Sequence, residues 1–291
     1  MTDTATGVAS GAAASAARES RRLRPTLVVG IVLVGFILLV AVVSLLWTPR
    51  DPLATDPIHR LQGSSAEHWL GTDGLGRDVA SQVMAGARVP LMVGAIAVVL
   101  SFVLGVPYGI AAAMTDTRLG PWLMRWNDIV QAFPALLLAV ILAAVFGGGT
   151  STAMVALGIG AAPGVARVVR SGTLQVLSRE YALAARAAGR GPLYTAMRHV
   201  LPNIRGILVV QASVGFALAV LSEAALSYLG LGTAPPTPSW GRMLQEAQAF
   251  LYVQPLVIVW PGIAIAVTVL GFNLLGDGLR DLLDPRMEVS R

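Results

Sequence analysis

Long, continuous runs of apolar residues restrict the folds open to this 291-residue chain more than any other feature. The first run, residues 27–47, contains no charged side chain. At about 1.5 Å of helical rise per residue, it is long enough to cross the roughly 30 Å hydrocarbon core of a membrane. Backbone groups in lipid need partners within the protein, and these runs lack the alternation of barrel strands. We therefore predict an all-α, polytopic membrane protein with about six transmembrane helices. The five further runs are residues 90–114, 127–146, 150–169, 207–228 and 256–275.

The composition excludes several classes of function. Only 13% of the residues are charged, against about 25% in soluble domains, and no cysteine is present for disulfide bonds or thiolate metal sites. All 21 basic residues are arginine, so the chain has no lysine with which to build a P-loop for ATP. His59, His68 and His199 have no metal-ligand spacing, and no nucleophile or paired-carboxylate signature occurs. We expect no enzyme, and neither a metal nor a cofactor bound by this chain itself.

The segment before the first apolar run, residues 1–26, is rich in Ala, Ser, Thr and Gly and has three arginines near its end, at positions 21, 22 and 24. Such a composition predicts a disordered tail. A cleaved signal peptide is the alternative for the first run. The apolar core of a signal peptide is usually about 7–15 residues long, and no small-x-small cleavage site follows here. We therefore interpret residues 27–47 as the first transmembrane helix and residues 48–88 as the loop after it.

The distribution of arginine predicts the orientation in the membrane. With the N-terminus inside the cell, sixteen of the 21 arginines fall in cytoplasmic segments, in agreement with the positive-inside rule. We therefore expect a plasma-membrane protein with both termini in the cytoplasm and with residues 48–88 outside. The arginines form no continuous patch, so membrane lipid rather than nucleic acid is the expected neighbour. The five in outer segments are Arg50, Arg60, Arg77, Arg88 and Arg242.

An alanine-rich segment, residues 180–189, lies between the fourth and fifth apolar runs. Ala182, Ala185 and Gly189 recur at helical spacing, which predicts a helix face with little side-chain bulk. A Gly-Arg-Gly-Pro sequence then breaks this helix. We expect two short helices within residues 171–202 that form a cytoplasmic knob able to enter a cleft of another protein. An ordinary basic loop is the alternative.

The spacing of Ala184, Ala185, Gly189, Leu201 and Pro202 resembles the EAA loop of ABC importer permeases, which is the segment that couples these permeases to their ATPases.

One position departs from the EAA pattern: Leu183 stands where the loop has its name-giving Glu, and Glu180 lies one helical turn earlier. This departure is typical of the peptide permeases. Over residues 21–288, the chain resembles the dipeptide/oligopeptide ABC permease family, the binding-protein-dependent transport system inner membrane components, and specifically its C-type subunit. The other segments that carry this resemblance are residues 68–78 with 86–88, 222–232 with 235–241, and 272–281 with 284–286.

The resemblance implies a type I ABC importer permease fold with a five-helix core at residues 89–288. It also implies a role as the transmembrane subunit of an ATP-driven importer of di- or oligopeptides. A second, homologous permease would form the translocation path with this chain, and an extracytoplasmic peptide-binding protein would deliver substrate. Cytoplasmic ATPase subunits would bind ATP and Mg and receive the coupling residues. Nickel chelates and glutathione, which relatives of the family also handle, stay open as substrates. The coupling residues are Glu180, Ala184, Ala185, Arg186, Gly189, Leu201 and Pro202.

Polar residues inside the apolar runs are candidates for the translocation path, because burial of a polar group in lipid is costly. Gln211, Glu223 and Asn273 are the candidate path residues, and each can equally bond to a neighbouring helix. Asp128 lies close to Arg125 in the sequence, so we expect these two residues to pair.

Two interpretations are open for the charges of the outer loop, Asp73, Arg77, Asp78 and Arg88. They can present exposed, pairable groups to a binding protein, or they can pair with one another inside a structured loop. Trp240, in the next outer region, is expected in the aromatic belt at the membrane interface, as is Tyr252.

Two other classes of function were weighed. A secondary transporter would use an ion gradient through Asp128 or Glu223, but no internal repeat supports this interpretation. An intramembrane enzyme would need a nucleophile–base or metal constellation, and the sequence contains none. ATP-independent uptake that is sensitive to a protonophore would favour the secondary transporter.

Overall fold

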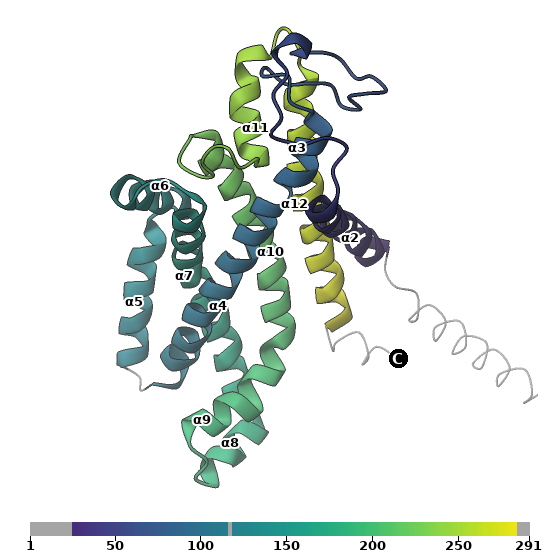
Figure 1. The fold of residues 1–291 in the computed structure, drawn as a ribbon. Helices are drawn as coiled ribbons and strands as arrows, with labels where there is room; N and C mark the ends of the chain where they lie inside the picture. Colours follow the sequence, from purple (N-terminus) through teal and green to yellow (C-terminus); the bar gives the residue numbers. More distant parts are fainter. Residues whose placement is uncertain (1–24, 116–117, 284–291) are drawn as a thin grey trace, which may run out of the picture.

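The computed structural model describes residues 25–115 and 118–283, and Figure 1 shows them as a bundle of helices. Within these residues the structure contains no β-strand and only one isolated bridge, which joins Thr72 and Asp78. The predicted all-α fold is therefore confirmed. The predicted tail, residues 1–26, lies outside the described residues except for its last two positions, which already belong to the first helix. The long helices are α2 (Pro25–Leu46), α4 (Arg88–Met114), α7 (Thr150–Leu177), α10 (Leu201–Tyr228) and α12 (Leu256–Leu283).

The third apolar run is not one helix. It divides into α5 (Leu119–Ala132) and α6 (Ala135–Phe146), whose axes are bent by 73°. The cause is Pro134: its ring disfavours helical geometry in the preceding residue, and Phe133 is extended, with φ −82° and ψ 121°. Within the described residues, five helices are long and apolar enough to span a membrane, and the bent pair counts as a sixth span. The number of spans agrees with the prediction, but the continuous helix over residues 127–146 was wrong.

Several helices extend beyond the apolar runs that predicted them. α7 continues to Leu177 and α12 to Leu283, while α10 begins at Leu201. An apolar run ends at the first charged residue, whereas a helix continues for as long as its backbone hydrogen bonds do. α4 begins at Arg88 and α3 (Val79–Gly86) precedes it, so the end of the predicted outer loop is helical.

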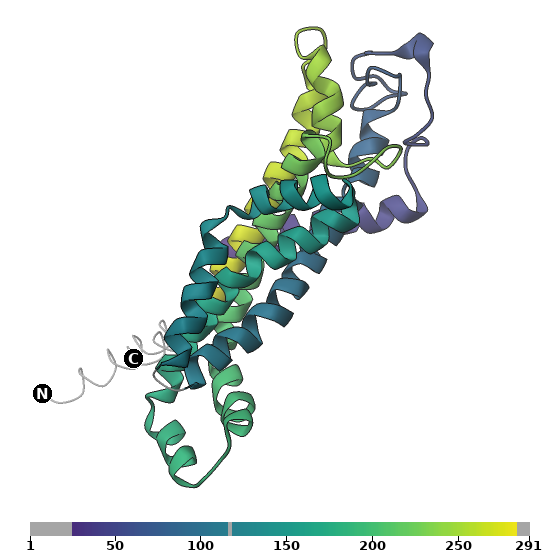
Figure 2. The ribbon, with the colours of Figure 1, turned by 90° about the vertical axis from the view of Figure 1, so that its left-hand side faces the viewer.

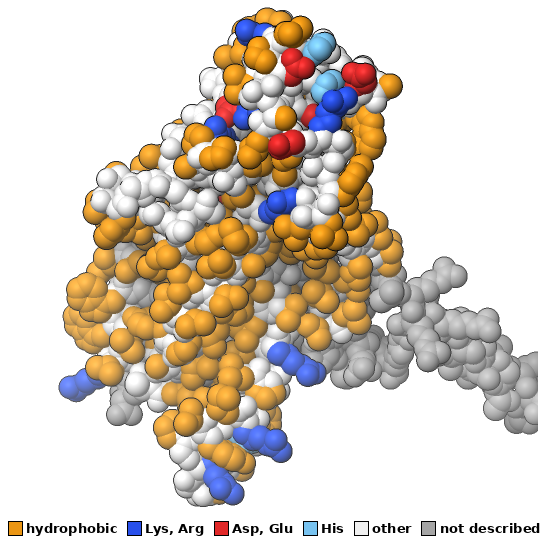
Figure 3. Space-filling model, viewed as in Figure 1, with side chains coloured by type: hydrophobic (Ala, Val, Ile, Leu, Met, Phe, Trp, Pro, Cys, Tyr) orange, Lys and Arg blue, Asp and Glu red, His pale blue; other side chains and the backbone are white. Residues whose placement is uncertain are grey.

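Short elements gather at the two ends of the bundle. We call them the α11 end and the α8 end, after the helices that lie there in Figure 1. A broad belt of exposed apolar side chains separates the two ends, and the charged groups visible in Figure 3 lie mainly above and below it. This arrangement is typical of a multi-pass membrane protein. The α11 end carries η1 (Pro57–His59), α3, α11 (Trp240–Ala247) and η3 (Gln248–Phe250). The α8 end carries α8 (Glu180–Ala187), α9 (Pro192–Thr195) and the π-helical segment η2 (Ala196–Val200).

Helices α4 and α7 pack closely because small residues let their backbones approach. A Cβ atom added at Gly105 would lie 2.7 Å from the carbonyl oxygen of Ala162, and one added at Gly109 would lie 2.4 Å from that of Ala166. Small residues four positions apart are a common means of helix association in membranes, where dispersion replaces the hydrophobic effect. α2 approaches α12 in the same way, with Gly30 against the backbone of Leu275.

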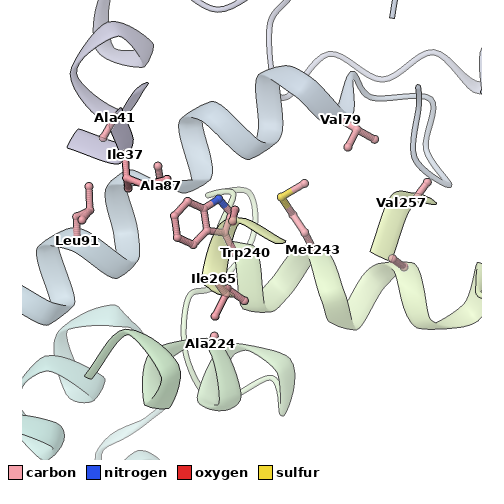
Figure 4. Close-up of a cluster of buried hydrophobic side chains, with 12 residues drawn as sticks. Ile37, Ala41, Val79, Ala87, Leu91, Ala224, Trp240, Met243, Val257 and Ile265 are labelled. Carbon is pink, nitrogen blue, oxygen red and sulfur yellow. The ribbon is translucent and has the colours of Figure 1, made fainter. Parts of the chain in front are cut away.

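Trp240 is the centre of the core at the α11 end. Its side chain is only 1% exposed, and Figure 4 shows its ring near Ala87 and Met243. Its indole Nε1 donates a hydrogen bond of 2.9 Å to the carbonyl of Val83, which ties α11 to α3. The prediction that Trp240 anchors the protein at the membrane interface was therefore wrong.

The close contact of α4 and α7 generates a stability prediction. Gly109→Ala should destabilise the protein by about 1–3 kcal/mol, because the new methyl group has backbone rather than a movable side chain in its way. Gly262→Ala, in α12, is the matched control, since nothing lies within 4 Å of a Cβ atom added at that position. It should be neutral or stabilise by about 1 kcal/mol through helix propensity. Thermal unfolding of the detergent-solubilised protein measures both, and equal midpoints for the two variants would contradict the packing described.

Candidate functional site

The alanine-rich segment at the α8 end forms the expected pair of short helices. Glu180 lies in the first turn of α8 and Arg186 in its last, where each charge is favourable to the helix dipole. α8 then ends in a Schellman motif, in which the Gly189 amide donates to the carbonyl of Arg186 at 2.9 Å and the Arg190 amide to that of Ala185 at 3.1 Å. This motif needs a left-handed residue, and Gly189 has φ +73°.

The small-residue face of α8 is only partly buried. Ala182 is fully buried and Ala185 is half-buried, whereas Gly189 is exposed and nothing lies within 4 Å of a Cβ atom added there. Ala182 therefore packs on the chain itself and is not available to another protein, because helical spacing defines a face without saying which way it points. The coupling residues named from the sequence divide accordingly. Leu201 is half-buried at the start of α10, whereas Glu180, Ala184, Arg186, Gly189 and Pro202 are exposed.

Large apolar side chains occupy the exposed surface of the knob. Leu183 is 51% exposed, Met197 is 60% exposed and Leu193 is 75% exposed. In Figures 1 and 2 the segment that carries them projects beyond the long helices. Sequence reasoning missed these residues because it concentrated on the small ones. The sequence signal that could have identified them is an apolar side chain between arginines in a loop, where polar residues are usual.

A cluster of rings fixes the angle between the short helices. The His199 ring lies between those of Tyr181 and Tyr194, with ring centroids 5.8 Å apart in both pairs. The guanidinium carbon of Arg190 lies 5.0 Å from the centre of the Tyr194 ring. We call these four residues the His199 cluster. It joins α8, α9 and η2, and the sequence had given no role to His199 beyond excluding it as a metal ligand.

The three candidate path residues lie in different surroundings. Gln211 is half-buried and lines a cavity of about 570 Å³ at the α8 end, while Asn273 is exposed on α12. Glu223 lies about 18 Å further along α10, at a helical rise of 1.5 Å per residue. It is fully buried, and its Oε1 accepts hydrogen bonds from Ser227 at 2.7 Å and Thr233 at 3.3 Å. Ser227 lies one turn further along the same helix and Thr233 lies in the loop after it, so these bonds do not reach a neighbouring helix.

Asp128 forms an ion pair across two helices rather than with its neighbour in sequence. Its Oδ1 lies 2.6 Å from Nη2 of Arg167 on α7, and both side chains are about half exposed. Arg125, the expected partner, instead lies over the ring of Trp122, 5.3 Å from its centre. The predicted Arg125 pair was wrong because Arg167 binds Asp128 from α7, while the Arg125 side chain lies over Trp122.

Buried charges at the α11 end pair with one another. Arg77 Nε donates to Asp73 at 2.7 Å, and Gln82 donates to the same carboxylate at 2.9 Å. Arg77 also contacts Glu246, which accepts a bond of 2.7 Å from Arg242. Burial alone would lower the pKa of Arg77, but the carboxylates of Asp73 and Glu246 more than offset this effect and raise it. Arg77 therefore stays charged and binds α11 to the loop.

The remaining charges of this loop are also used internally. The ring of His68 lies 2.9 Å from Asp78, whose other oxygen caps α3 by accepting from the amide of Ser81 at 2.8 Å. Arg88 donates to the hydroxyl of Ser44 at 2.8 Å and so joins α4 to α2. The internal pairing of the loop charges is confirmed, and their interpretation as an exposed docking surface was wrong.

The described part of the chain contains no group of three or more His, Asp or Glu side chains placed to hold a metal ion.

Comparison with known proteins identifies relatives along most of the chain. The family model of the binding-protein-dependent transport system inner membrane component matches residues 105–289. The dipeptide transport system permease protein DppC of Escherichia coli K12 is 42% identical, over 90% of this chain and 89% of that protein. The protein of the same name from Alkalihalophilus pseudofirmus is 39% identical, over 90% of this chain and 86% of its own length.

A solved structure shares the fold. The MetNI methionine ABC transporter in an inward-facing form aligns with a TM-score of 0.58 at 20% identity, over 70% of this chain and 96% of that one. The predicted type I ABC importer permease fold is therefore confirmed.

The buried ion pairs generate a second prediction. Arg77→Met should destabilise the loop of residues 47–78 by about 3 kcal/mol, because it leaves the Asp73 carboxylate buried with only neutral donors. Limited proteolysis should then cut this loop faster. Arg60→Met is the matched control, since this exposed arginine of the same loop has no ion pair within the described residues. Equal cleavage of the two variants would show that the pair contributes nothing to the order of the loop.

Proposed function

The chain belongs to the family of binding-protein-dependent transport system inner membrane components, and from this membership we propose that it is the transmembrane subunit of an ATP-driven importer of di- or oligopeptides. The observation that carries the proposal is the 42% identity to a dipeptide permease along nearly the full length of both chains. As a member of this family, the chain is a non-catalytic membrane component, and hydrolysis of ATP belongs to a separate subunit.

The knob at the α8 end enters a cleft on that ATPase subunit. Leu183, Leu193 and Met197 support this contact, because large apolar side chains exposed together beyond the membrane belt mark an interaction surface. Arg186 and Arg190 flank them, so a cleft with an apolar floor and an acidic rim is complementary. ATP and Mg bind to the partner, since this chain has no lysine for a P-loop.

The α8 end lies in the cytoplasm, with both termini on that side, and the α11 end faces the extracytoplasmic binding protein. The excess of arginine in the segments on the α8 side supports this orientation. At the α11 end the buried charges are used internally, so exposed aromatic and apolar side chains make the contact with the binding protein. Ile58, Trp69 and Tyr252 are such side chains, at 86%, 56% and 97% exposure.

The translocation path runs between this chain and a second, homologous permease, and Asn273 lines it. Asn273 is an exposed polar side chain on a membrane-spanning helix, a costly arrangement against lipid but not against water. Gln211, which is half-buried, lines the cavity at the α8 end instead. Glu223 acts at the outer end, where its bonds to Ser227 and Thr233 hold the loop after α10 in place.

An ion-driven carrier is not favoured by the same observations. Asp128 is engaged by Arg167, and the family to which the chain belongs depends on binding proteins. Uptake into proteoliposomes that contain the purified complex tests the proposal. A labelled dipeptide should accumulate only with ATP inside the vesicles and binding protein outside, and a protonophore should have no effect. Accumulation without ATP would overturn the proposal, and exclusive uptake of a nickel chelate or glutathione would overturn its substrate class.

Substitutions at two glycines, Gly189 and Gly191, test the role of the turn in the knob. Gly189→Val should uncouple transport from ATP hydrolysis, because a left-handed backbone costs about 1–2 kcal/mol for an L-residue and opens the Schellman turn. The control is Gly191→Val: Gly191 has φ −65° and also has open space around its Cβ position. Peptide transported per ATP hydrolysed should fall for the first variant alone. Normal transport by Gly189→Val would refute the role of this turn.

The His199 cluster generates a further prediction. His199→Ala removes two ring contacts worth about 0.5–1.5 kcal/mol each, so the productive angle of the knob should become roughly tenfold less populated. Transport per ATP should fall accordingly, while His199→Phe, which keeps a ring, should restore most of it. An His199→Ala protein as well coupled as the wild type would show that the cluster does not position α8.

A further inference from the structure

A cavity of about 570 Å³ opens between the ends of α7, α10 and α12 at the α8 end of the bundle. Two arginines line it, Arg205 from α10 and Arg280 from α12, together with the side-chain amides of Gln175, Asn203 and Gln211. No acidic side chain lines the cavity. All of its polar side chains can donate hydrogen bonds, so the cavity is suited to an anion.

The two arginines are not used by the fold. Among the ion pairs of residues 25–115 and 118–283, none includes Arg205 or Arg280, and both side chains are exposed. The arginines at the other end of the bundle differ, since Arg77 and Arg242 are bound by carboxylates there. Both guanidinium groups line one cavity, so an anion bound there is attracted by two positive charges.

The rest of the lining is apolar. Ile207, Val210 and Leu283 belong to it, and Ile207 and Leu283 are themselves 41% and 38% exposed. The cavity therefore combines a cationic part with an apolar part that is open at the surface. A small inorganic anion would use only the first part, whereas a phospholipid would use both, with its phosphate on the arginines and its chains along the apolar rim.

We propose that this cavity binds the head group of an anionic membrane phospholipid, with Arg205 and Arg280 as its phosphate-binding residues. The site goes beyond the transport function, because it depends only on the charge and the apolar rim of this chain. Its occupant touches Pro202 near the start of α10, which follows the knob, so lipid composition acts next to the element that the proposed coupling uses.

The test measures lipid retained by the purified complex. The complex is placed in nanodiscs of phosphatidylcholine that contain phosphatidylglycerol, released into detergent, and analysed by native mass spectrometry. Wild type should retain phosphatidylglycerol in preference to phosphatidylcholine. Each of Arg205→Gln and Arg280→Gln should reduce this preference roughly fivefold, and the double variant by roughly thirtyfold, from the usual contribution of one arginine near an anionic surface. Arg118→Gln, an exposed arginine outside the cavity, should leave it unchanged.

Two competition experiments distinguish a lipid head group from other anions that could occupy the cavity. Inorganic phosphate at millimolar concentration should not displace phosphatidylglycerol, and neither should a dipeptide with a free carboxylate. Displacement by phosphate would assign the cavity to a soluble anion. Displacement by the dipeptide, but not by its amide, would assign it to the translocation path, of which Gln211 is a candidate residue. Either displacement, or equal retention by wild type and the double variant, would overturn the lipid site.

Discussion

The absence of water from the hydrocarbon core is the constraint on which the rest of this structure depends. Every backbone amide within the membrane has to be bonded inside the protein, so the chain crosses as helices. Because lipid is as apolar as the side chains, the helices are held by close contact, and Gly105 and Gly109 provide it for α4 against α7. Within the described residues one span is interrupted, at Pro134, and it divides into two helices that each keep their own hydrogen bonds.

The two ends of the bundle differ in whether their side chains are paired within the chain or exposed. At the α11 end, Arg77, Asp73 and Glu246 bind one another, and Trp240 fills the space between the short helices, so a long loop becomes a rigid cap. At the α8 end the polar groups are left open, and the large side chains of the knob face outward. The buried charges of the cap are paired within the chain, whereas the large side chains of the knob are exposed. This difference suits a transport subunit that receives substrate at one end and force at the other.

The sequence predicted the fold class, the number of spans and the position of the knob, because these follow from apolar runs and from helix-breaking residues. It failed where the answer depends on which way a helix face turns. Ala182, on the small-residue face of α8, packs inward, and Asp128 meets Arg167 from another helix rather than Arg125 from its own. The contact of Tyr181 with His199 was equally inaccessible, since the Schellman turn at Gly189 has to form before the two rings can meet.

The central claim is that the knob formed by α8 and α9 is the contact through which an ATPase drives this chain. Site-specific photo-cross-linking in intact membranes tests it most directly. A photoreactive residue in place of Leu193, the most exposed of the three large apolar side chains of the knob, should cross-link to an ABC ATPase subunit. The same residue in place of Trp69, an exposed side chain at the α11 end, should not. A cross-link to the ATPase from position 69, or none from position 193 in a complex that still transports, would contradict the account.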